Sequence, residues 1–430
     1  MSKLALLGGP QVIEPRVPSD VNVWAWRDLE DAFVQYTGAK YALAVTSGTA
    51  ALRSALVAAD VGPGDEVITV AHTWIASVAA ILQANAIPVF ADVSKHTFNM
   101  DIEDAARKIT PSTKAILPVD FYGLPAQTDE LMDLAARHNL LVVEDACQAG
   151  GGEIDGVKLG NIAHLTAFSF SGKPLSTKGG GILTTNDRRL YEKAMLAGQH
   201  PSLLMKRITE PDLGRYIDFG GRGDNLRPFA AMMRDVLSDM YTADIQIDAR
   251  IRNCEYLTRK LADVPAITPQ HVPKGYKHVY HMYTCLLDAD QLPVSRDLFL
   301  EALRAEGVPC IAYINRANFY FTEGGEPLSA RPIHLRAPFQ EVDYYGKGCP
   351  FLCPHAQRRP DYSEGSLPVT EWLAPREFSL LQRTLSAPNG EKEMQQIVDA
   401  INKVLDGADE LAQASPEALQ RPLQKQRQTT

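Results

Sequence analysis

Short apolar runs alternate with helical patterns along the first half of the chain. The runs that predict strands are, in chain order, Tyr41–Val45, Val67–Ala71, Ile87–Asp92, Lys114–Val119, Leu140–Asp145, Leu165–Phe170 and Gly181–Thr185. Helical patterns lie between them, for example over Thr49–Ala59 and Ile75–Asn85. Strands that are apolar at nearly every position are typical of a sheet buried on both faces. The sequence therefore predicts an α/β fold with a mostly parallel central sheet flanked by helices.

The second half of the chain predicts a change of domain. A long helical pattern from Pro228 to about Ala262 leads into mixed short strands and helices that run to Leu405. The length of 430 residues suits about two or three domains. We expect an N-terminal arm at residues 1–22, a large α/β domain at 23–245, a smaller C-terminal α+β domain at 246–405 and a disordered polar tail at 406–430.

Charge and composition narrow the class of protein. The 43 basic and 52 acidic residues give a net charge of −9, which disfavours nucleic acid or an anionic membrane as a partner. No apolar run approaches the ~18 residues that a membrane span needs, and the first residues lack a signal-peptide core. The six cysteines are scattered, and Cys349 and Cys353 with His355 make a poor zinc signal, so no metal site is predicted. These features indicate a cytoplasmic protein with reduced thiols.

Three features at predicted strand ends carry candidate chemistry. Thr46-Ser47-Gly48-Thr49 opens a helix, where backbone N–H groups bind phosphate or where Ser47 is a plain N-cap. Asp145 ends a buried strand, so either a cationic ring nitrogen compensates its desolvation or it caps a loop. Lys173 follows another strand among Gly and Ser, which suits a Schiff-base nucleophile as well as an exposed turn lysine. A phosphate cradle, a carboxylate and a lysine together are what pyridoxal phosphate requires.

Five motifs extend this interpretation to a family. They are Ala44-Val-Thr-Ser-Gly-Thr-Ala-Ala-Leu52, Val67-Ile-Thr-Val-Ala-His-Thr-Trp-Ile75, Pro88-Val-Phe-Ala-Asp-Val93, Val143-Glu-Asp-Ala-Cys-Gln-Ala149 and Phe168-Ser-Phe-Ser-Gly-Lys173. In this order they resemble the DegT/DnrJ/StrS family of sugar aminotransferases, from about Leu4 to Leu405. The resemblance implies the aspartate-aminotransferase type I fold, pyridoxal phosphate as cofactor, and keto-sugars or keto-cyclitols as substrates. The segment from Gly307 to Tyr320 is similar to the branch that aminates cyclitols or makes aminohydroxybenzoate.

The resemblance also implies roles for individual residues around the cofactor ring. Lys173 would bind the cofactor aldehyde as a Schiff base and then shuttle a proton. Asp145 would pair with the pyridinium nitrogen and keep the ring an electron sink. Trp74 would stack on the ring face, unless it serves only packing, and Gln148 would approach the phenolic oxygen.

A second group of residues is implied to hold the phosphate. Gly48, Thr49 and Ser169 would bind it within one subunit, and Asn225 would reach the phosphate of the neighbouring subunit. The last contact implies a homodimer with shared active sites. Asn225 alternatively belongs to a turn before a helix that starts at Pro228.

The chain also departs from the family's pattern near the lysine. The segment between Ser169 and Lys173 is about one residue short, so Ser171 is an alternative phosphate ligand. Counting back from Gly180-Gly181 still favours Lys173 over Lys178 as the Schiff-base position.

Other departures affect the substrate pocket. Asp120 stands where the family usually has His, the stretch between Arg16 and Trp26 is short, and residues 339–367 form a long insert. Four residues that are interpreted more readily as structural than as catalytic are His72, His278, His281 and Tyr283.

These observations predict a pyridoxal-phosphate-dependent aminotransferase. It would move an amino group from glutamate or glutamine to a keto-sugar or keto-cyclitol in aminosugar or aminocyclitol antibiotic biosynthesis. One alternative is a pyridoxamine-phosphate-dependent sugar dehydratase on the same fold, but such relatives replace the lysine by His, unlike Lys173. Another is a non-catalytic regulator that binds the cofactor, which the acidic charge and the missing helix-turn-helix signal disfavour.

Overall fold

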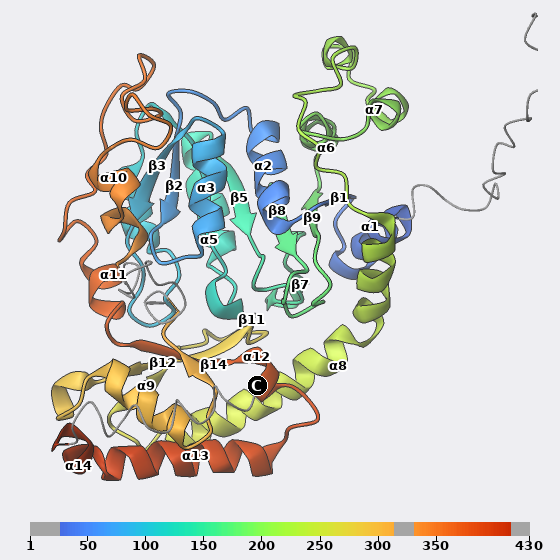
Figure 1. Ribbon diagram of the computed structural model, residues 1–430. Coiled ribbons are helices and arrows are strands. Elements are labelled where there is room, and N and C mark those ends of the chain that lie inside the picture. The colour runs from blue at the N-terminus through green and yellow to red at the C-terminus, as the bar shows by residue number, and fades with distance from the viewer. Residues whose placement is uncertain (1–25, 314–330, 414–430) are drawn as a thin grey trace, which may run out of the picture.

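The computed structural model describes residues 26–313 and 331–413, and its centre is a seven-stranded sheet in the order β1-β9-β8-β5-β4-β2-β3 (Figure 1). The strands are β1 (Tyr41–Val45), β2 (Glu66–Val70), β3 (Ile87–Ala91), β4 (Thr113–Ile116), β5 (Leu141–Asp145), β8 (Leu165–Ser169) and β9 (Gly181–Thr185). Strands β3, β2, β4, β5 and β8 run parallel, whereas β9 is antiparallel to both β8 and β1. The predicted α/β fold with a mostly parallel sheet is confirmed. The N-terminal arm expected at residues 1–22 lies outside the described residues.

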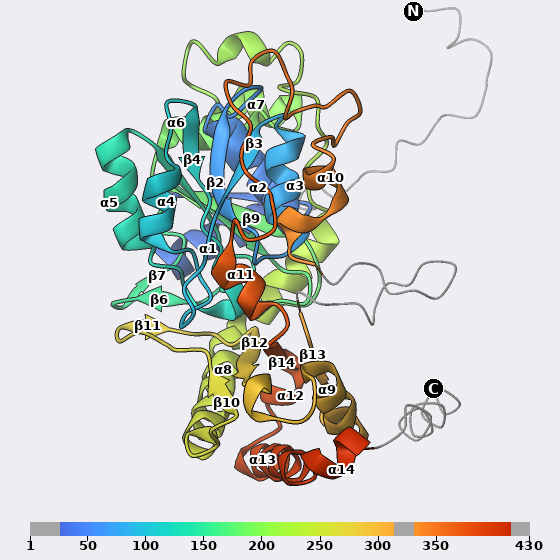
Figure 2. The ribbon, with the colours of Figure 1, turned by 90° about the vertical axis from the view of Figure 1, so that its left-hand side faces the viewer.

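Helices cover both faces of this sheet because its strands are apolar on both sides. Every residue of β2, β3 and β9 is buried. Figure 2 shows α4 and α5 on one side of the sheet and α3 on the other. The helices that surround the sheet are α1 (Trp26–Thr37), α2 (Gly48–Ala58), α3 (Ile75–Gln83), α4 (Ile102–Lys108), α5 (Thr128–His138), α6 (Arg188–Met195) and α7 (Pro201–Arg207).

A 32-residue helix, α8 (Ala230–Leu261), leads from the large sheet to the C-terminal part (Figure 1). Its buried residues up to Ile247 recur at intervals of three, four or seven, which places them on one face of the helix, whereas the buried stripe is wider from Ala249 onward. Residues up to Ile247 pack in a core with α1, and those from Cys254 onward pack in a second core with the C-terminal strands. The change of core therefore occurs between Ile247 and Cys254, and the domain division at 245/246 stays a prediction.

The C-terminal part is built on a four-stranded antiparallel sheet with the order β10-β12-β14-β13. Its elements are β10 (Ile267–Pro269), β12 (Met282–Leu287), α9 (Arg296–Ala305), β13 (Cys310–Ile311), α11 (Pro368–Leu373), β14 (Glu377–Leu381), α12 (Gln382–Leu385) and α13 (Glu391–Asp406). A small sheet of β6 (Glu153–Ile154), β7 (Val157–Lys158) and β11 (Tyr276–Lys277) joins this part to the large domain. The two parts are thus connected by a shared sheet as well as by α8.

Residues 333–367 pack against the large domain, although the sequence analysis assigned them to the C-terminal domain at 246–405. This segment, which contains α10 (Ala337–Gln340), forms an apolar core with β3. Phe339 and Tyr362 lie edge-on to Phe90 of β3, with ring centroids 5.2 and 5.6 Å away. The linear domain boundary is therefore wrong for this insert, because apolar side chains in an irregular segment do not reveal which sheet they cover.

An ion pair between an exposed arginine and a buried glutamate joins the same insert to β2. Arg358 donates to the carboxylate of Glu66 through Nε at 2.7 Å and through Nη2 at 3.2 Å. Glu66 is only 1% exposed, so its charge requires such a partner. The hydroxyl of Tyr362 adds a hydrogen bond of 2.7 Å to the carbonyl oxygen of Pro88. The insert is therefore an integral cover of β2 and β3.

The tail predicted at 406–430 begins too early. Residues Ala408–Gln413 form a further helix, α14, and Ala408 is buried in the C-terminal core. The polarity of the segment hid the few apolar contacts that hold this helix. Residues 414–430 lie outside the described part of the chain. None of the helices within the two described ranges has the length and apolar character needed to cross a membrane.

Candidate active site

The candidate site lies at the carboxyl ends of β5 and β8, where α2 begins. Ser47 caps α2 by accepting a hydrogen bond of 3.1 Å from the backbone N–H of Ala50. The next residue, Gly48, is so close to its neighbours that an added Cβ would lie 2.6 Å from Sγ of Cys147 and 2.8 Å from Cβ of Ser169. Only glycine fits there, and the first turn of the helix presents backbone N–H groups beside Gly48 and Thr49. The predicted N-cap is therefore present in this turn, and the phosphate cradle at Gly48 and Thr49 stays a prediction.

Asp145 is held at the end of β5 by two hydrogen bonds. Its Oδ2 accepts from the hydroxyl of Ser77 at 2.7 Å, and its Oδ1 accepts from the backbone N–H of Cys147 at 3.2 Å. The hydroxyl of Thr73 lies 2.9 Å from that of Ser77 and extends the chain of hydrogen bonds. The carboxylate is 5% exposed, so its orientation is fixed by these contacts rather than by water.

Lys173 lies in a closed loop between β8 and β9. Backbone hydrogen bonds join Phe170 to Gly179 and Gly180 at the base of the loop, and the N–H of Lys173 donates to the carbonyl of Ser176 at 2.9 Å. Lys173 is half-buried, whereas Lys178 in the same loop is exposed. The two lysines that the sequence offered for the Schiff base therefore differ in their surroundings.

Cys147 lies between the three candidate features. Burial raises the pKa of its thiol well above the usual range, the nearby carboxylate of Asp145 raises it further, and the nearby ammonium of Lys173 opposes the rise. Because the same thiol packs against the position of Gly48, the helix start, the carboxylate and the lysine lie around one point.

His281 contacts the lysine, a feature that the sequence analysis missed. Its Nε2 lies 3.4 Å from Nζ of Lys173, and its Nδ1 lies 3.1 Å from Oε1 of Gln382 at the start of α12. The sequence interpretation favoured a structural role for His281. The contact spans 108 positions of the chain, so no local pattern reveals it. By contrast, the ring of His278 stacks on Tyr280 away from this contact.

Gln148 and Trp74 meet Tyr313 beside the same strand end. The Nε2 of Gln148 donates to the hydroxyl of Tyr313 at 3.1 Å, while its Oε1 accepts from the backbone N–H of Tyr122 at 2.9 Å. Trp74 immediately precedes α3, is 38% exposed, and has its ring centroid 6.2 Å from that of Tyr313. Tyr313, which the sequence analysis did not single out, is therefore a member of the site from the C-terminal part.

Asn225 is exposed and belongs to an irregular segment before α8. Its Oδ1 accepts from Nε of Arg227 at 2.9 Å. The carbonyl of the adjacent Leu226 accepts from the N–H of Thr46 at 2.9 Å, just before the α2 cradle. The segment is thus anchored beside the start of α2 in its own subunit, and the side chain of Asn225 is exposed at the surface.

Two polar residues suggested near the pocket are instead buried in the interior. Asp120 is fully buried, and its Oδ1 accepts from the N–H of Ala126 at 2.7 Å. Burial and the nearby carboxylate of Glu144 raise the pKa of Asp120 well above its usual range. Asp120 therefore does not line an open surface, and its effect on the substrate pocket stays a prediction. His72 is also buried, which lowers its pKa to about 3, and it contacts Tyr122 at 3.4 Å.

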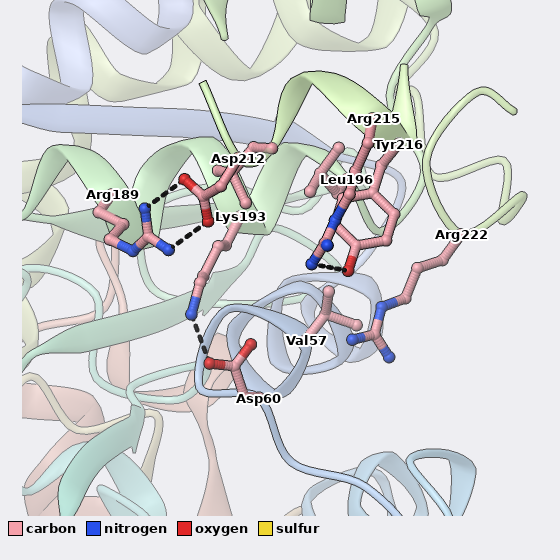
Figure 3. A pocket seen from close by; sticks show the side chains of 10 residues that line it. Val57, Asp60, Arg189, Lys193, Leu196, Asp212, Arg215, Tyr216 and Arg222 are labelled. Atoms are coloured by element: carbon pink, nitrogen blue, oxygen red, sulfur yellow. Dashed lines mark hydrogen bonds and ion pairs between the residues drawn. The ribbon is translucent and has the colours of Figure 1, made fainter. Parts of the chain in front are cut away.

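A separate cavity of about 210 Å³ lies between the end of α2, α6 and the segment up to Arg222 (Figure 3). The guanidinium of Arg189 donates to both carboxylate oxygens of Asp212, at 2.9 and 2.7 Å, and Lys193 pairs with Asp60. None of the candidate site residues lines this cavity. Most of its charges are therefore neutralised by one another, and it is distinct from the site at β5 and β8.

The residues at β5, β8 and α2 fit one kind of cofactor. The cradle at Gly48 suits a phosphate, the fixed carboxylate of Asp145 suits a protonated ring nitrogen, and the amine of Lys173 suits an aldehyde. The fold and this arrangement define a pyridoxal-phosphate-dependent transferase of the aspartate-aminotransferase type. The chain belongs to the DegT/DnrJ/EryC1/StrS aminotransferase family, whose profile matches residues 25–325. It is an aminotransferase, and its cofactor is pyridoxal phosphate.

Individual relatives cover different shares of the chain. It is 38% identical over 286 residues to GDP-perosamine synthase of Caulobacter vibrioides, covering 65% of this chain and 74% of the relative. It is 32% identical over 395 residues to L-glutamine:2-deoxy-scyllo-inosose aminotransferase of Streptomyces lividus, covering 88% and 85%. Among solved structures, an aminotransferase from Psychrobacter cryohalolentis matches with a TM-score of 0.73 and 27% identity, covering 90% of this chain and 92% of that one.

Proposed function

We propose that this enzyme transfers an amino group from glutamate or glutamine to the keto group of a sugar or cyclitol, as a cytoplasmic step in aminosugar or aminocyclitol antibiotic biosynthesis. The observation that carries the proposal is the lysine and carboxylate pair around Cys147 in a chain of this family. One relative is named for a GDP-linked aminosugar and another for a cyclitol, which supports a polyhydroxylated keto acceptor. The six free cysteines suit a reducing compartment.

In this proposal Lys173 and Asp145 carry the chemistry. When bound, pyridoxal phosphate supplies an electron sink that makes the Cα hydrogen of the amino donor acidic. Lys173 binds the cofactor through Nζ and then carries a proton between donor and cofactor. Asp145, oriented by Ser77 and Cys147, keeps the ring nitrogen protonated. The half-buried position of Lys173 supports its choice over the exposed Lys178.

The remaining roles follow the positions of the side chains. Gly48 and Thr49 bind the phosphate through the start of α2, and Ser169 binds it through its hydroxyl. Ser169 is supported over Ser171 because it packs against Gly48, whereas Ser171 is exposed. Trp74 stacks on the ring, and Gln148 approaches the phenolic oxygen.

The acceptor class is tested by separating the two half reactions. The purified chain is given glutamate, glutamine or alanine one at a time, and the visible absorption of the bound cofactor is followed. We expect glutamate or glutamine to remove the absorption and a GDP-linked keto-sugar or a free keto-cyclitol to restore it, with an aminated product found by mass spectrometry. Restoration by simple keto acids alone would contradict the proposed acceptor class. Formation of a deoxy-sugar without net amination would favour the dehydratase, the alternative that Lys173 disfavours.

We further propose a homodimer with shared active sites. Large apolar side chains are exposed around the N-terminal part of α8, namely Phe229 at 73%, Ile245 at 65% and Tyr241 at 79%. A monomer in water gains nothing by exposing such side chains, whereas a second copy would bury them. The exposed segment that contains Asn225 directly precedes this helix, so a second copy that covers the helix can also contact Asn225.

Mixing two inactive variants tests the shared sites. Lys173→Ala subunits are combined with Asn225→Ala subunits under conditions that allow exchange. If Asn225 serves the neighbouring subunit, both lesions fall in one site of the mixed dimer and the other site is intact. Random mixing of equal amounts should then restore roughly one quarter of the wild-type activity, because about half of the dimers are mixed and each has one intact site.

The alternative is that Asn225 acts within its own subunit, and this predicts a different result for the mixed variants. The backbone bond between Leu226 and Thr46 also brings Asn225 near the cradle of its own subunit. If Asn225 acts there, every site of the mixed dimer carries one lesion and no activity returns. Subunit exchange is verified by mass spectrometry with one isotopically labelled variant, and Asn225→Ala alone must be dimeric and inactive.

A further inference from the structure

The C-terminal part of the chain reaches the candidate lysine through one histidine. His281 lies immediately before β12, and its Nε2 is 3.4 Å from Nζ of Lys173 in the large domain. The distance is within reach of a hydrogen bond but long for one, as is common in sites that tighten when ligands bind. His281 is 6% exposed and Lys173 is half-buried, so the contact lies partly away from water.

The backbone around His281 is held in a single position. The N–H of Val279 donates to the carbonyl of Gly123 at 3.0 Å. Gly123 has a φ of +101°, and a Cβ there would lie 2.7 Å from the backbone nitrogen of His281. Only glycine permits this approach, and Tyr280 adopts the left-handed region with a φ of +50°. Such close contacts and strain are kept where the surroundings fix a segment firmly.

A buried arginine of α8 ties the histidine segment to the lysine loop. Arg250 is 1% exposed and donates through Nε to the carbonyl of Val279 at 3.2 Å. Its Nη2 lies 3.5 Å from the carbonyl of Pro174, the residue after Lys173, and its Nη1 is 3.3 Å from the hydroxyl of Ser386. Burial lowers the pKa of Arg250 to about 10. One arginine side chain therefore joins the lysine loop, the histidine segment and the end of α12.

Gln382 sets the orientation of the imidazole. Its Oε1 lies 3.1 Å from Nδ1 of His281, and an amide oxygen can only accept a hydrogen bond. Nδ1 therefore carries the ring hydrogen in the neutral imidazole, and the lone pair of Nε2 faces Lys173. An imidazole in this tautomer accepts a hydrogen bond from an ammonium group.

We infer that His281, oriented by Gln382, is a positioning residue that holds the protonated form of Lys173 in place while it carries a proton. The inference rests on the proposed role of Lys173 as the proton carrier. A protonated Nζ donates to Nε2 of His281, which fixes the ammonium within the site instead of letting it rotate on its flexible side chain. Gln382 acts through His281 and has no contact role of its own in this arrangement.

Chemical labelling of the full-length chain without cofactor tests the contact directly. Trace acetic anhydride is applied over a range of pH, and labelling of Lys173 is compared with that of the exposed Lys178 in the same loop. In His281→Phe the ammonium loses an acceptor that favours the charged form, so labelling of Lys173 below its titration midpoint should rise by about tenfold. Asp145, Cys147 and Asp120 stay in place in every variant.

Two further variants keep the experiment decisive if His281→Phe is poorly folded. His281→Gln places an amide oxygen where Nε2 stands, and its labelling profile should remain close to that of the wild type. Gln382→Leu removes the orienting acceptor and should shift the labelling of Lys173 in the same direction, but less. Adding Gln382→Leu to His281→Phe should change nothing further, because both act through one imidazole.

The kinetics of the loaded enzyme provide the second measurement. His281→Phe should lower kcat by about 10²-fold with little change in KM for the amino donor. A donor deuterated at Cα should then slow kcat more than it does in the wild type, because proton transfer limits the rate. Unchanged labelling and an unchanged isotope effect in a folded His281→Phe would overturn the inference. An active Lys173→Ala variant would instead contradict the proposed function itself. That result is distinct from the labelling and the isotope effect in His281→Phe, which test only the role of His281.

Discussion

Lys173→Ala is expected to abolish transamination, with kcat reduced by about 10³-fold or more, because it removes both the covalent attachment and the proton carrier. Borohydride reduction of the wild-type enzyme should fix the cofactor to the peptide that contains Lys173, and the variant should yield no such peptide. Lys173 is only half-buried and its loop is closed by backbone hydrogen bonds, so the fold should survive the change. The loss would therefore report on chemistry.

Lys178→Ala is the matched control for this prediction. Lys178 belongs to the same loop and has the same charge, but it is exposed. Its replacement should leave turnover within about twofold of the wild type, as is usual for surface positions. Attachment of the cofactor to Lys178, together with full activity of Lys173→Ala, would contradict the prediction. It would show that Lys178, and not Lys173, is the Schiff-base position.

Asp145→Asn is expected to lower kcat by about 10²-fold to 10⁴-fold and to weaken cofactor binding, because a neutral amide cannot keep the ring nitrogen protonated. The hydrogen bonds survive the change. The amide oxygen still accepts from the N–H of Cys147, and the hydroxyl of Ser77 can rotate to accept from the new NH₂ group. The measurements are steady-state turnover and the concentration of pyridoxal phosphate needed for half saturation.

Asp120→Asn provides a control for that result within the same buried region. Asp120 is fully buried, and burial raises its pKa well above its usual range, which favours the protonated form that an amide matches in shape and charge. Turnover and cofactor affinity should stay close to those of the wild type. Equal losses in both variants would mean that Asp145 acts through the stability of the interior and not through the cofactor.

Much of the fold was predictable because its strands are buried on both faces. β1 and β9 have the predicted bounds, and the other strands of the central sheet differ from their predicted bounds by a few residues at most. A continuous apolar run flanked by turn residues is a strong local signal, and helix–strand alternation limits the possible topologies. The antiparallel direction of β9 and the docking of residues 333–367 depend on long-range packing, which no local pattern encodes.

The residues of the candidate site also fall into those that the local sequence predicts and those that it does not. Gly48, Asp145 and Lys173 stand at the ends of predicted strands, where motifs and spacing are informative. His281 and Tyr313 come from the C-terminal part and meet these residues only in three dimensions. Their sequence surroundings resemble those of ordinary core residues, so spacing alone could not separate a contact with Lys173 from a packing role.

The insert also determines how the large sheet ends. β3 is the last strand on its side, and the free hydrogen-bonding groups of such an edge strand can pair with strands of other molecules. Residues 333–367 cover this region with an apolar core and neutralise the buried Glu66. A shortened chain without them would expose Phe90 at an open sheet edge and leave an uncompensated charge beneath it. The insert thus gives the last strand of the large sheet a packed apolar cover, whatever it contributes to the choice of substrate.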